Sequence, residues 1–385
     1  MAQSHKAGFA VGLGTVADRL TIRAIETTPV RVPLSRTYRG STYQMTHRST
    51  LLTRVVTEEG IVGEAYAGDE DADLLTIEAI VHGEIEPLLV GEDAFAIERC
   101  WERARPVTFD ILRNRRLGLV ATACVDAALW DAVGKALDQP LWRLWGGYRS
   151  QLPMIAIAGY HDSPVSLAEE VAELQELGLA GMKLKVGSGS IEHDAARVRE
   201  ARAAGGPDFV LAADANQRWT LDEAVRFARL VEDEGLVWLE EPCRWDNDRR
   251  LLREVRIAAR VPVCAGQTEL SAAGCLDLMT CGSVDVCNFD SSWSGGPTEW
   301  RRVATAAQLL GIAMAHHEEP QVAAHLLASI PHGTYLECFH PDRDPIWWNL
   351  VANRPSLVDG WIELSDRPGL GWELDLEYLE AHAVA

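Results

Sequence analysis

The chain has 385 residues, of which 47% are hydrophobic and 24% charged, which is typical of a globular protein large enough for two domains. Its formal net charge of −21 argues against nucleic acid or an anionic membrane surface as a partner. The eight cysteines contain no CxxC pair, which argues against zinc and thioredoxin-like sites and favours the reducing cytoplasm.

The N-terminal third of the chain divides into a leader and a mixed domain. Residues 1–19 predict a disordered leader, because three glycines interrupt an apolar stretch that would otherwise suit a signal peptide. Residues 20–147 predict an α+β domain, with strands at residues 51–57 and 60–65. The apolar residues of segment 119–137 recur at helical spacing on most faces, which predicts a buried helix.

The pattern changes between residues 148 and 340, where short apolar runs alternate with amphipathic stretches. Eight runs and about seven intervening helices predict a parallel barrel. An open doubly wound sheet is the alternative, but the even spacing favours closure. The runs lie at residues 154–157, 181–185, 209–213, 236–239, 261–264, 284–288, 311–315 and 334–338.

Charged side chains follow three successive runs, each about one βα unit apart. Lys183-Leu-Lys185 ends the first of them, Asp214 the next and Glu240-Glu-Pro the third. The carboxyl ends of neighbouring parallel strands open into one pocket. Asp214 and Glu240 are hard oxygen donors, which suit Mg²⁺ better than they suit a softer metal. Each acid alone would more often be a solvated helix cap, but the set favours a metal site.

The next run leaves the third metal ligand open. Gln267 occupies the position equivalent to Glu240, and its amide oxygen could bind a metal directly. Glu269 follows two residues later and would reach the metal if the loop bulges.

The two lysines are candidates for acid–base chemistry. Alternation along the run points Lys183 and Lys185 into the same pocket. One would hold a substrate carboxylate while the other removes a proton. We expect the like charge of Lys183, together with the metal, to depress the pKa of Lys185.

A second acid–base group is expected on the far side of the pocket. Asp290 ends the sixth run and His317 follows the seventh, and an aspartate that accepts from Nδ1 fixes the histidine tautomer. His316 and Glu319 are alternatives in the same segment. Glu337 ends the eighth run, where its carboxylic acid would donate to a substrate oxygen.

These motifs resemble the enolase superfamily, in the mandelate racemase subgroup, over nearly the whole chain beyond the leader. Their number and their order make the resemblance specific. The motifs that carry the resemblance are residues 123–135 and 140–147, Lys183-x-Lys185, Asp214-x-Asn216, Glu240-Glu-Pro242, Asp290 with Ser294-Gly-Gly296, His317 with His325-Leu-Leu327, Glu337, and Pro368-Gly-Leu-Gly-Trp372.

The resemblance implies a capping α+β domain over a (β/α)7β TIM-like barrel, with residues 341–385 completing the cap. It implies Mg²⁺ held by Asp214, Glu240 and a third strand-end acid. The family usually has Glu or Asp where this chain has Gln267, so we prefer Glu269 as that acid.

The resemblance also implies roles for the remaining residues. Lys185 would be the base on one face of the substrate, and the Asp290–His317 pair would act on the other. Glu337 and Lys183 would both contact the substrate carboxylate.

We therefore expect a dehydratase that converts an aldonate or aldarate into a 2-keto-3-deoxy acid. Residues 36–48 are rich in hydrogen-bonding groups, as a polyhydroxylated substrate requires, although they would also suit an exposed polar loop. Arg39, Tyr43 and His47 in this segment, with Asn216, are the expected substrate-binding residues. The alternatives are a racemase or epimerase of an α-hydroxy acid and a non-catalytic sugar-acid binder, and we expect a homo-oligomer in each case.

Overall fold

The computed structural model describes residues 18–67 and 73–384, so the expected leader lies almost wholly outside the described residues. The first layer is a three-stranded antiparallel sheet, in the order β1-β2-β3. Its strands are β1 (Ile22–Arg39), β2 (Gln44–Thr57) and β3 (Val62–Ala67).

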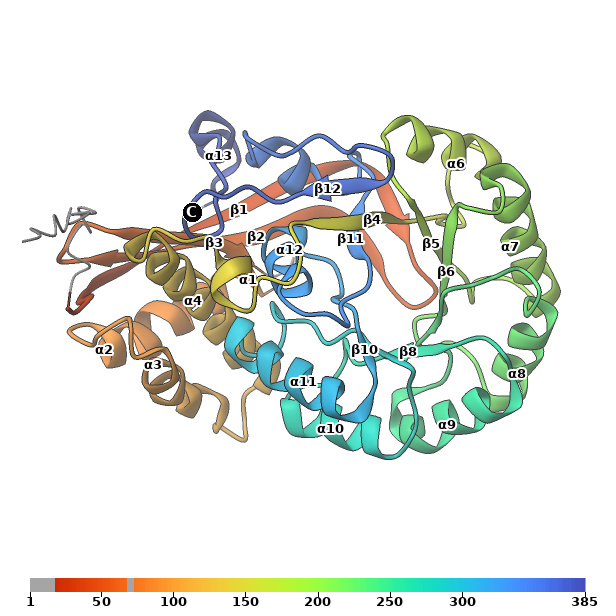
Figure 1. Cartoon of the computed structure of the whole chain (residues 1–385), viewed down its shortest axis with the longest axis horizontal. Coiled ribbons are helices and arrows are strands. Elements are labelled where there is room, and N and C mark those ends of the chain that lie inside the picture. The colour runs from red at the N-terminus through yellow and green to blue at the C-terminus, as the bar shows by residue number, and fades with distance from the viewer. Residues whose placement is uncertain (1–17, 68–72, 385) are drawn as a thin grey trace, which may run out of the picture.

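Both strands expected in this region are confirmed, and β2 begins seven residues earlier than its expected start at residue 51. It is longer because its ladder with β1 continues without a break as far as the pair Pro33–His47 and then resumes beyond an irregularity, where Tyr38 pairs with Met45. The polar segment 36–48 is therefore mostly the tip of a β-hairpin. This hairpin extends from the cap across the barrel (Figure 1).

Helices cover one side of the small sheet (Figure 1). The longest, α4 (Arg115–Ala136), begins where the side chain of Asn114 accepts from the backbone N–H of Arg116, and it packs against β2 and β3. By length and composition α4 would cross a membrane, but 89% of its apolar window is buried inside the protein, as expected for a core helix. The shorter elements are α1 (Leu74–Ile80), a π-helical turn (Val81–Ile85), α2 (Glu86–Leu89), α3 (Ile97–Ala104), a 3-10 turn (Arg105–Thr108) and α5 (Leu141–Leu144).

The second part of the molecule is the expected barrel of parallel strands with helices outside (Figure 1). Its strands are β4 (Gln151–Ala158), β5 (Gly181–Lys185), β6 (Val210–Asp214), β7 (Leu239–Glu240), β8 (Val263–Ala265), β9 (Val286–Cys287), β10 (Ala313–Met314) and β11 (Leu336–Phe339). Its helices are α6 (Leu167–Glu176), α7 (Ile191–Gly205), α8 (Leu221–Leu230), α9 (Asp248–Ala258, after a 3-10 turn at Trp245–Asn247), α10 (Ala272–Thr280), α11 (Pro297–Leu310) and α12 (Pro320–Ala328).

The strands run side by side from β10 through β9, β8, β7, β6, β5 and β4 to β11. The remaining gap is bridged where Thr334 donates its N–H to the carbonyl of Met314 at 2.8 Å. The barrel interior contains a cluster of buried apolar side chains. Those side chains are Ile155, Ala212, Trp238, Cys264, Val286 and Ala315.

The C-terminal tail returns to the cap, as expected. After a π-helical turn (Ile346–Leu350), β12 (Trp361–Glu363) pairs antiparallel with β4. The last helix, α13 (Leu376–His382), lies against β1, and Val384 donates its N–H to the carbonyl of Pro29 at 2.9 Å. The first and last parts of the chain thus build one capping domain on the barrel.

Candidate active site

Three charged residues lie side by side at the carboxyl ends of strands β5, β6 and β7. Lys185 pairs in register with Asp214, and Asp214 with Glu240. All three are buried, and the two acids are completely inaccessible to solvent. The positions predicted from the spacing of the apolar runs therefore converge in one place.

Each lysine is bonded to carboxylates. Lys183 Nζ lies 2.7 Å from Oε1 of Glu240 and 2.9 Å from Oε2 of Glu337, and thereby links β5 to β7 and β11. Lys185 Nζ lies 2.6 Å from Oδ2 of Asp214 and 3.3 Å from Oδ1 of Asn216.

The charges of these carboxylates decide the pKa values of the two lysines. Burial lowers the pKa of Lys185, but the charge and hydrogen bond of Asp214, together with Tyr43 and Tyr160, hold that pKa well above its usual value. The pKa of Lys183 is likewise raised, by Glu240 and Glu337 against burial. Among the described residues the charge nearest to Lys185 is the anion Asp214 and not the second lysine. The depression of the Lys185 pKa expected from Lys183 together with Mg²⁺ stays a prediction.

Glu240 is held from two sides. One carboxylate oxygen accepts from Lys183, and the other, Oε2, accepts from the indole N–H of Trp238 at 2.9 Å. Trp238 lies two residues before Glu240, just ahead of β7, and its side chain is buried in the cluster inside the barrel. Burial raises the pKa of Glu240 to about 8, against the charge of Lys183.

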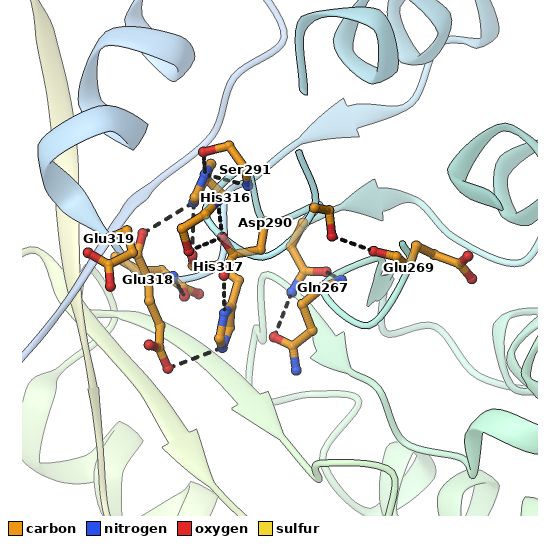
Figure 2. A network of polar contacts seen from close by, with 12 residues as sticks. Gln267, Glu269, Asp290, Ser291, His316, His317, Glu318 and Glu319 are labelled. Carbon is orange, nitrogen blue, oxygen red and sulfur yellow. Dashed lines mark hydrogen bonds and ion pairs between the residues drawn. The ribbon is translucent and has the colours of Figure 1, made fainter. Parts of the chain in front are cut away.

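Glu269, the preferred third ligand, does not face Asp214 and Glu240. Its carboxylate Oε1 lies 2.6 Å from Nη1 of Arg249, and Figure 2 shows it pointing away from the histidines and from Gln267. The chain turns sharply at Gly266, with a φ of 141°, instead of bulging so as to bring residue 269 inward. This corrects the expectation for Glu269.

Gln267 does point into the site, where it contacts two neighbouring side chains. Its Nε2 donates to Oε2 of Glu241 at 3.1 Å, and its Oε1 accepts from Asn288 at 3.4 Å. Glu241 also accepts from Gln217 and from the hydroxyl of Thr268.

Two carboxylates and one amide are available for a metal. Among the described ranges there is no cluster of three or more His, Cys, Asp or Glu side chains arranged to hold an ion. Asp214, Glu240 and the amide oxygen of Gln267 are nevertheless all hard oxygen donors, so they fit Mg²⁺ rather than a thiolate-seeking metal.

The expected histidine–aspartate pair is present. His317 Nδ1 lies 2.9 Å from Oδ2 of Asp290, while Oδ1 of Asp290 accepts from the backbone N–H and the hydroxyl of Ser292 (Figure 2). The ring of Trp293 packs against the imidazole, with centroids 4.7 Å apart. Despite burial, which lowers it, the pKa of His317 is raised well above its usual value by Glu318 and Asp290.

The two alternatives for this pair face elsewhere. His316 Nε2 bonds to the backbone N–H and the hydroxyl of Ser291, behind the pair (Figure 2). Burial lowers the pKa of His316. Glu319 receives a hydrogen bond of 2.6 Å from the buried guanidinium of Arg48.

Glu318 was not singled out from the sequence. Its Oε1 lies 3.2 Å from Nε2 of His317, on the side of the ring opposite Asp290, and its backbone N–H donates to Oε2 of Glu337. The His-His-Glu-Glu-Pro run was the available signal, but of its two glutamates only Glu319 was considered. Trp238 was also missed, because it lies in an apolar run that is typical of a buried core.

The hairpin tip carries the expected substrate-binding residues. Lys185 Nζ lies 5.6 Å from the centre of the Tyr43 ring, and Ser41 donates to the carbonyl of Ala215 at 3.0 Å, so the tip reaches the carboxyl ends of the strands. Arg39 is more than half exposed and pairs with Asp162.

The remaining two substrate-binding candidates, His47 and Asn216, contact different neighbours. The ring of His47 contacts the hydroxyl of Thr46 on β2. The side chain of Asn216 contacts Asp214 and Lys185 directly. Substrate binding by Arg39, Tyr43, His47 and Asn216 stays a prediction.

Comparison with known proteins agrees with this geometry. Residues 22–146 match the family model of the mandelate racemase/muconate lactonizing enzyme N-terminal domain, and residues 166–379 match that of the enolase C-terminal domain-like family. The chain therefore belongs to the enolase superfamily of enzymes, in the mandelate racemase/muconate lactonizing enzyme subgroup.

Individual relatives differ in the reaction that their names describe. The chain is 30% identical to the 3,6-anhydro-alpha-L-galactonate cycloisomerase of Streptomyces coelicolor, over 94% of this chain and 99% of that protein. It is 29% identical to the arabinonate dehydratase of Saccharolobus solfataricus, over 84% and 87%. Further relatives are named as sugar-acid dehydratases and as dipeptide epimerases.

A solved structure is more similar in sequence. It is a mandelate racemase/muconate lactonizing enzyme from a marine actinobacterium, crystallised in complex with magnesium. The two chains are 56% identical, with a TM-score of 0.91 over 95% of this chain and 100% of that one.

Proposed function

We propose that this protein is a Mg²⁺-dependent hydro-lyase that dehydrates a sugar acid, an aldonate or aldarate, to a 2-keto-3-deoxy acid. The observation that carries the proposal is that an amine and an imidazole enter one buried site from strands that are not neighbours. Lys185 ends β5, and His317 follows β10. Dehydration next to a carboxylate needs both a base for the α-proton and an acid for the β-hydroxyl.

Asp214, Glu240 and the amide oxygen of Gln267 are the residues that would hold Mg²⁺. When bound, Mg²⁺ supplies positive charge for the substrate carboxylate and for the negative charge that develops on it during proton removal. Lys183 and Glu337 adjoin these residues, where they would contact the same carboxylate.

Lys185 has to be neutral before it can remove a proton. In the structure its ammonium group is bonded to Asp214, and that contact favours the charged form. Any group that neutralises Asp214 therefore favours the neutral amine.

His317 completes the reaction on the opposite side. The proton on Nε2 passes to the β-hydroxyl, which leaves as water. The electrons of the β-carbon–oxygen bond leave with that water molecule. The carbon–carbon double bond forms from the electrons of the α-C–H bond that Lys185 breaks. The resulting enol becomes the ketone of a 2-keto acid by moving its hydroxyl proton to carbon.

The polar hairpin tip supports a polyhydroxylated substrate. Ser41, Tyr43 and Arg39 offer hydroxyl, phenol and guanidinium groups close to the strand ends. The relatives named as dehydratases of arabinonate, talarate/galactarate and xylonate support the same substrate class.

A racemase or epimerase is the second candidate, because the same two groups would serve it. With Lys185 on one face of the substrate and His317 on the other, one would remove the α-proton and the other would return it. The relatives named as epimerases support this alternative.

The deciding experiment is a screen of a sugar-acid library with the purified protein, in Mg²⁺ and in EDTA. Release of a 2-keto acid in Mg²⁺ only, and its loss in Lys185→Ala, is the expected result. Inversion of an α-carbon with no keto acid from any substrate would establish the epimerase instead. Binding of sugar acids without turnover would indicate a non-catalytic binder.

We also propose a cytoplasmic location and a homo-oligomeric state. All eight cysteines are free thiols, and seven of them are buried, which suits a reducing compartment. Light scattering coupled to size-exclusion chromatography would measure the oligomeric state directly.

A further inference from the structure

The imidazole of His317 lies between two carboxylates. Asp290 Oδ2 is 2.9 Å from Nδ1, and Glu318 Oε1 is 3.2 Å from Nε2 (Figure 2). The first contact is a hydrogen bond, and the second is within ion-pair distance. Two carboxylates that flank one ring favour its positively charged imidazolium form over either neutral tautomer.

The backbone at Glu318 is held in a conformation that directs its side chain back towards the ring. Glu318 and Glu319 have φ values of 51° and 46°, which are rare for residues other than glycine and concentrate at functional sites. The N–H of Glu318 is fixed by Glu337, and the carboxylate of Glu319 is fixed by Arg48. Pro320 then begins α12, so the two strained residues are the last two of the connection between β10 and that helix.

We propose that Glu318 is a positioning residue that keeps His317 as an imidazolium, so that this side of the pocket donates a proton. The inference rests on the proposed role of His317 and deepens it. A site with an imidazolium on one side and a lysine base on the other is suited to elimination, since the two groups perform different half-steps. A site that racemises in both directions needs His317 to be neutral for one of them.

The other charges around the ring are consistent with this role. Asp290 faces it from the loop after β9, Glu240 acts on it from β7, and His316 lies beside it as a buried histidine with a lowered pKa. Arg343 from the C-terminal tail and Arg48 from β2 act on Glu318 and, with His317, hold its pKa below the usual range against burial. Glu318 is therefore ionised, and the groups nearest the imidazole are anions.

The test is a pH titration of His317 in the full-length protein with Mg²⁺ present, followed by nitrogen-15 NMR of labelled histidines. The His317 signal is assigned from its loss in His317→Asn. In Glu318→Gln the titration midpoint should fall by about 1 to 3 pH units, because one of the two neighbouring anions is gone. Glu319→Gln is the matched control, since that carboxylate is also buried and in a strained backbone but faces Arg48; its midpoint should equal that of the wild type.

Equal midpoints in the wild type and Glu318→Gln, or equal shifts in both variants, would overturn the proposal. If Glu318→Gln does not fold, the wild-type spectrum alone decides. The proposal is overturned if either ring nitrogen of His317 lacks a proton at neutral pH. These spectra need no substrate, so failure of the dehydratase assay leaves them interpretable. If keto acid is formed, the high-pH limb of kcat should move to lower pH in Glu318→Gln.

Discussion

Replacing Trp238 by phenylalanine tests how the barrel interior supports the proposed metal site. The indole N–H donates to Oε2 of Glu240 at 2.9 Å, while Lys183 bonds the other oxygen. Phenylalanine keeps an aromatic ring in this buried position but removes the donor. Glu240 then loses the contact that fixes the orientation of its carboxylate, and Mg²⁺ binding should weaken.

The magnitude follows from that single hydrogen bond. A bond to a charged acceptor contributes about 1.5–3 kcal/mol, which corresponds to a loss of about 10- to 100-fold in Mg²⁺ affinity. Losses of about the same size are seen when groups that orient metal ligands are removed from other proteins. Isothermal titration of the purified protein with Mg²⁺ measures the effect directly.

Trp347→Phe is the control for the loss of ring volume. Trp347 is fully buried in the C-terminal tail, and its indole nitrogen has no hydrogen-bond acceptor among the described residues. It should lower stability without changing Mg²⁺ affinity. An unchanged affinity in Trp238→Phe, or an equal loss in Trp347→Phe, would refute the reasoning.

Three further predictions use other parts of the site and the core. Lys185→Ala should lower kcat by about 10²- to 10⁴-fold, as steady-state kinetics would measure, while titration should show that Mg²⁺ still binds. Activity near that of the wild type would rule out Lys185 as the base. Gln267→Glu should place a second carboxylate against Glu241, so that repulsion lowers Tm in EDTA while the added ligand charge raises Tm in Mg²⁺. Glu269→Gln should leave Mg²⁺ affinity unchanged, because that acid faces Arg249. Burial lowers the pKa of His325 to about 4, so the unfolded chain, with a pKa of 6.5, takes up the proton first as pH falls. The neutral His325 side chain therefore contributes about 3 kcal/mol to the free energy of unfolding at neutral pH, and this contribution is lost between about pH 6.5 and pH 4. In His325→Gln, the free energy of unfolding measured in urea should depend less steeply on pH. The same dependence as in the wild type would contradict the prediction.

The positions of the charged residues were predictable because strand spacing is regular. Asp214, Glu240 and Lys185 each end an apolar run, and parallel strands in register bring such ends together. The alternation of side chains along the run was enough to point both lysines inward. These features depend on periodicity, which a sequence displays directly.

What could not be predicted depends on individual backbone turns. Glu269 was misplaced because the chain reverses at Gly266, where a Cβ would lie 2.9 Å from Sγ of Cys287. The contact of Glu318 with His317 depends on two strained φ values that no composition pattern encodes. The direct bond between Lys185 and Asp214 was not foreseen either, because spacing along the chain does not supply distances.

The return of the tail to the cap has a consequence for biosynthesis. Strand β12 pairs with β4, and α13 lies against β1, so contacts join residues separated by most of the chain. During translation, the antiparallel sheet and the first barrel strands leave the ribosome long before their partners exist. Their edges and apolar faces stay uncovered until the last few dozen residues emerge, and pairings this remote in sequence form slowly. A nascent chain that stalls before residue 361 would therefore be a strong candidate for capture by chaperones.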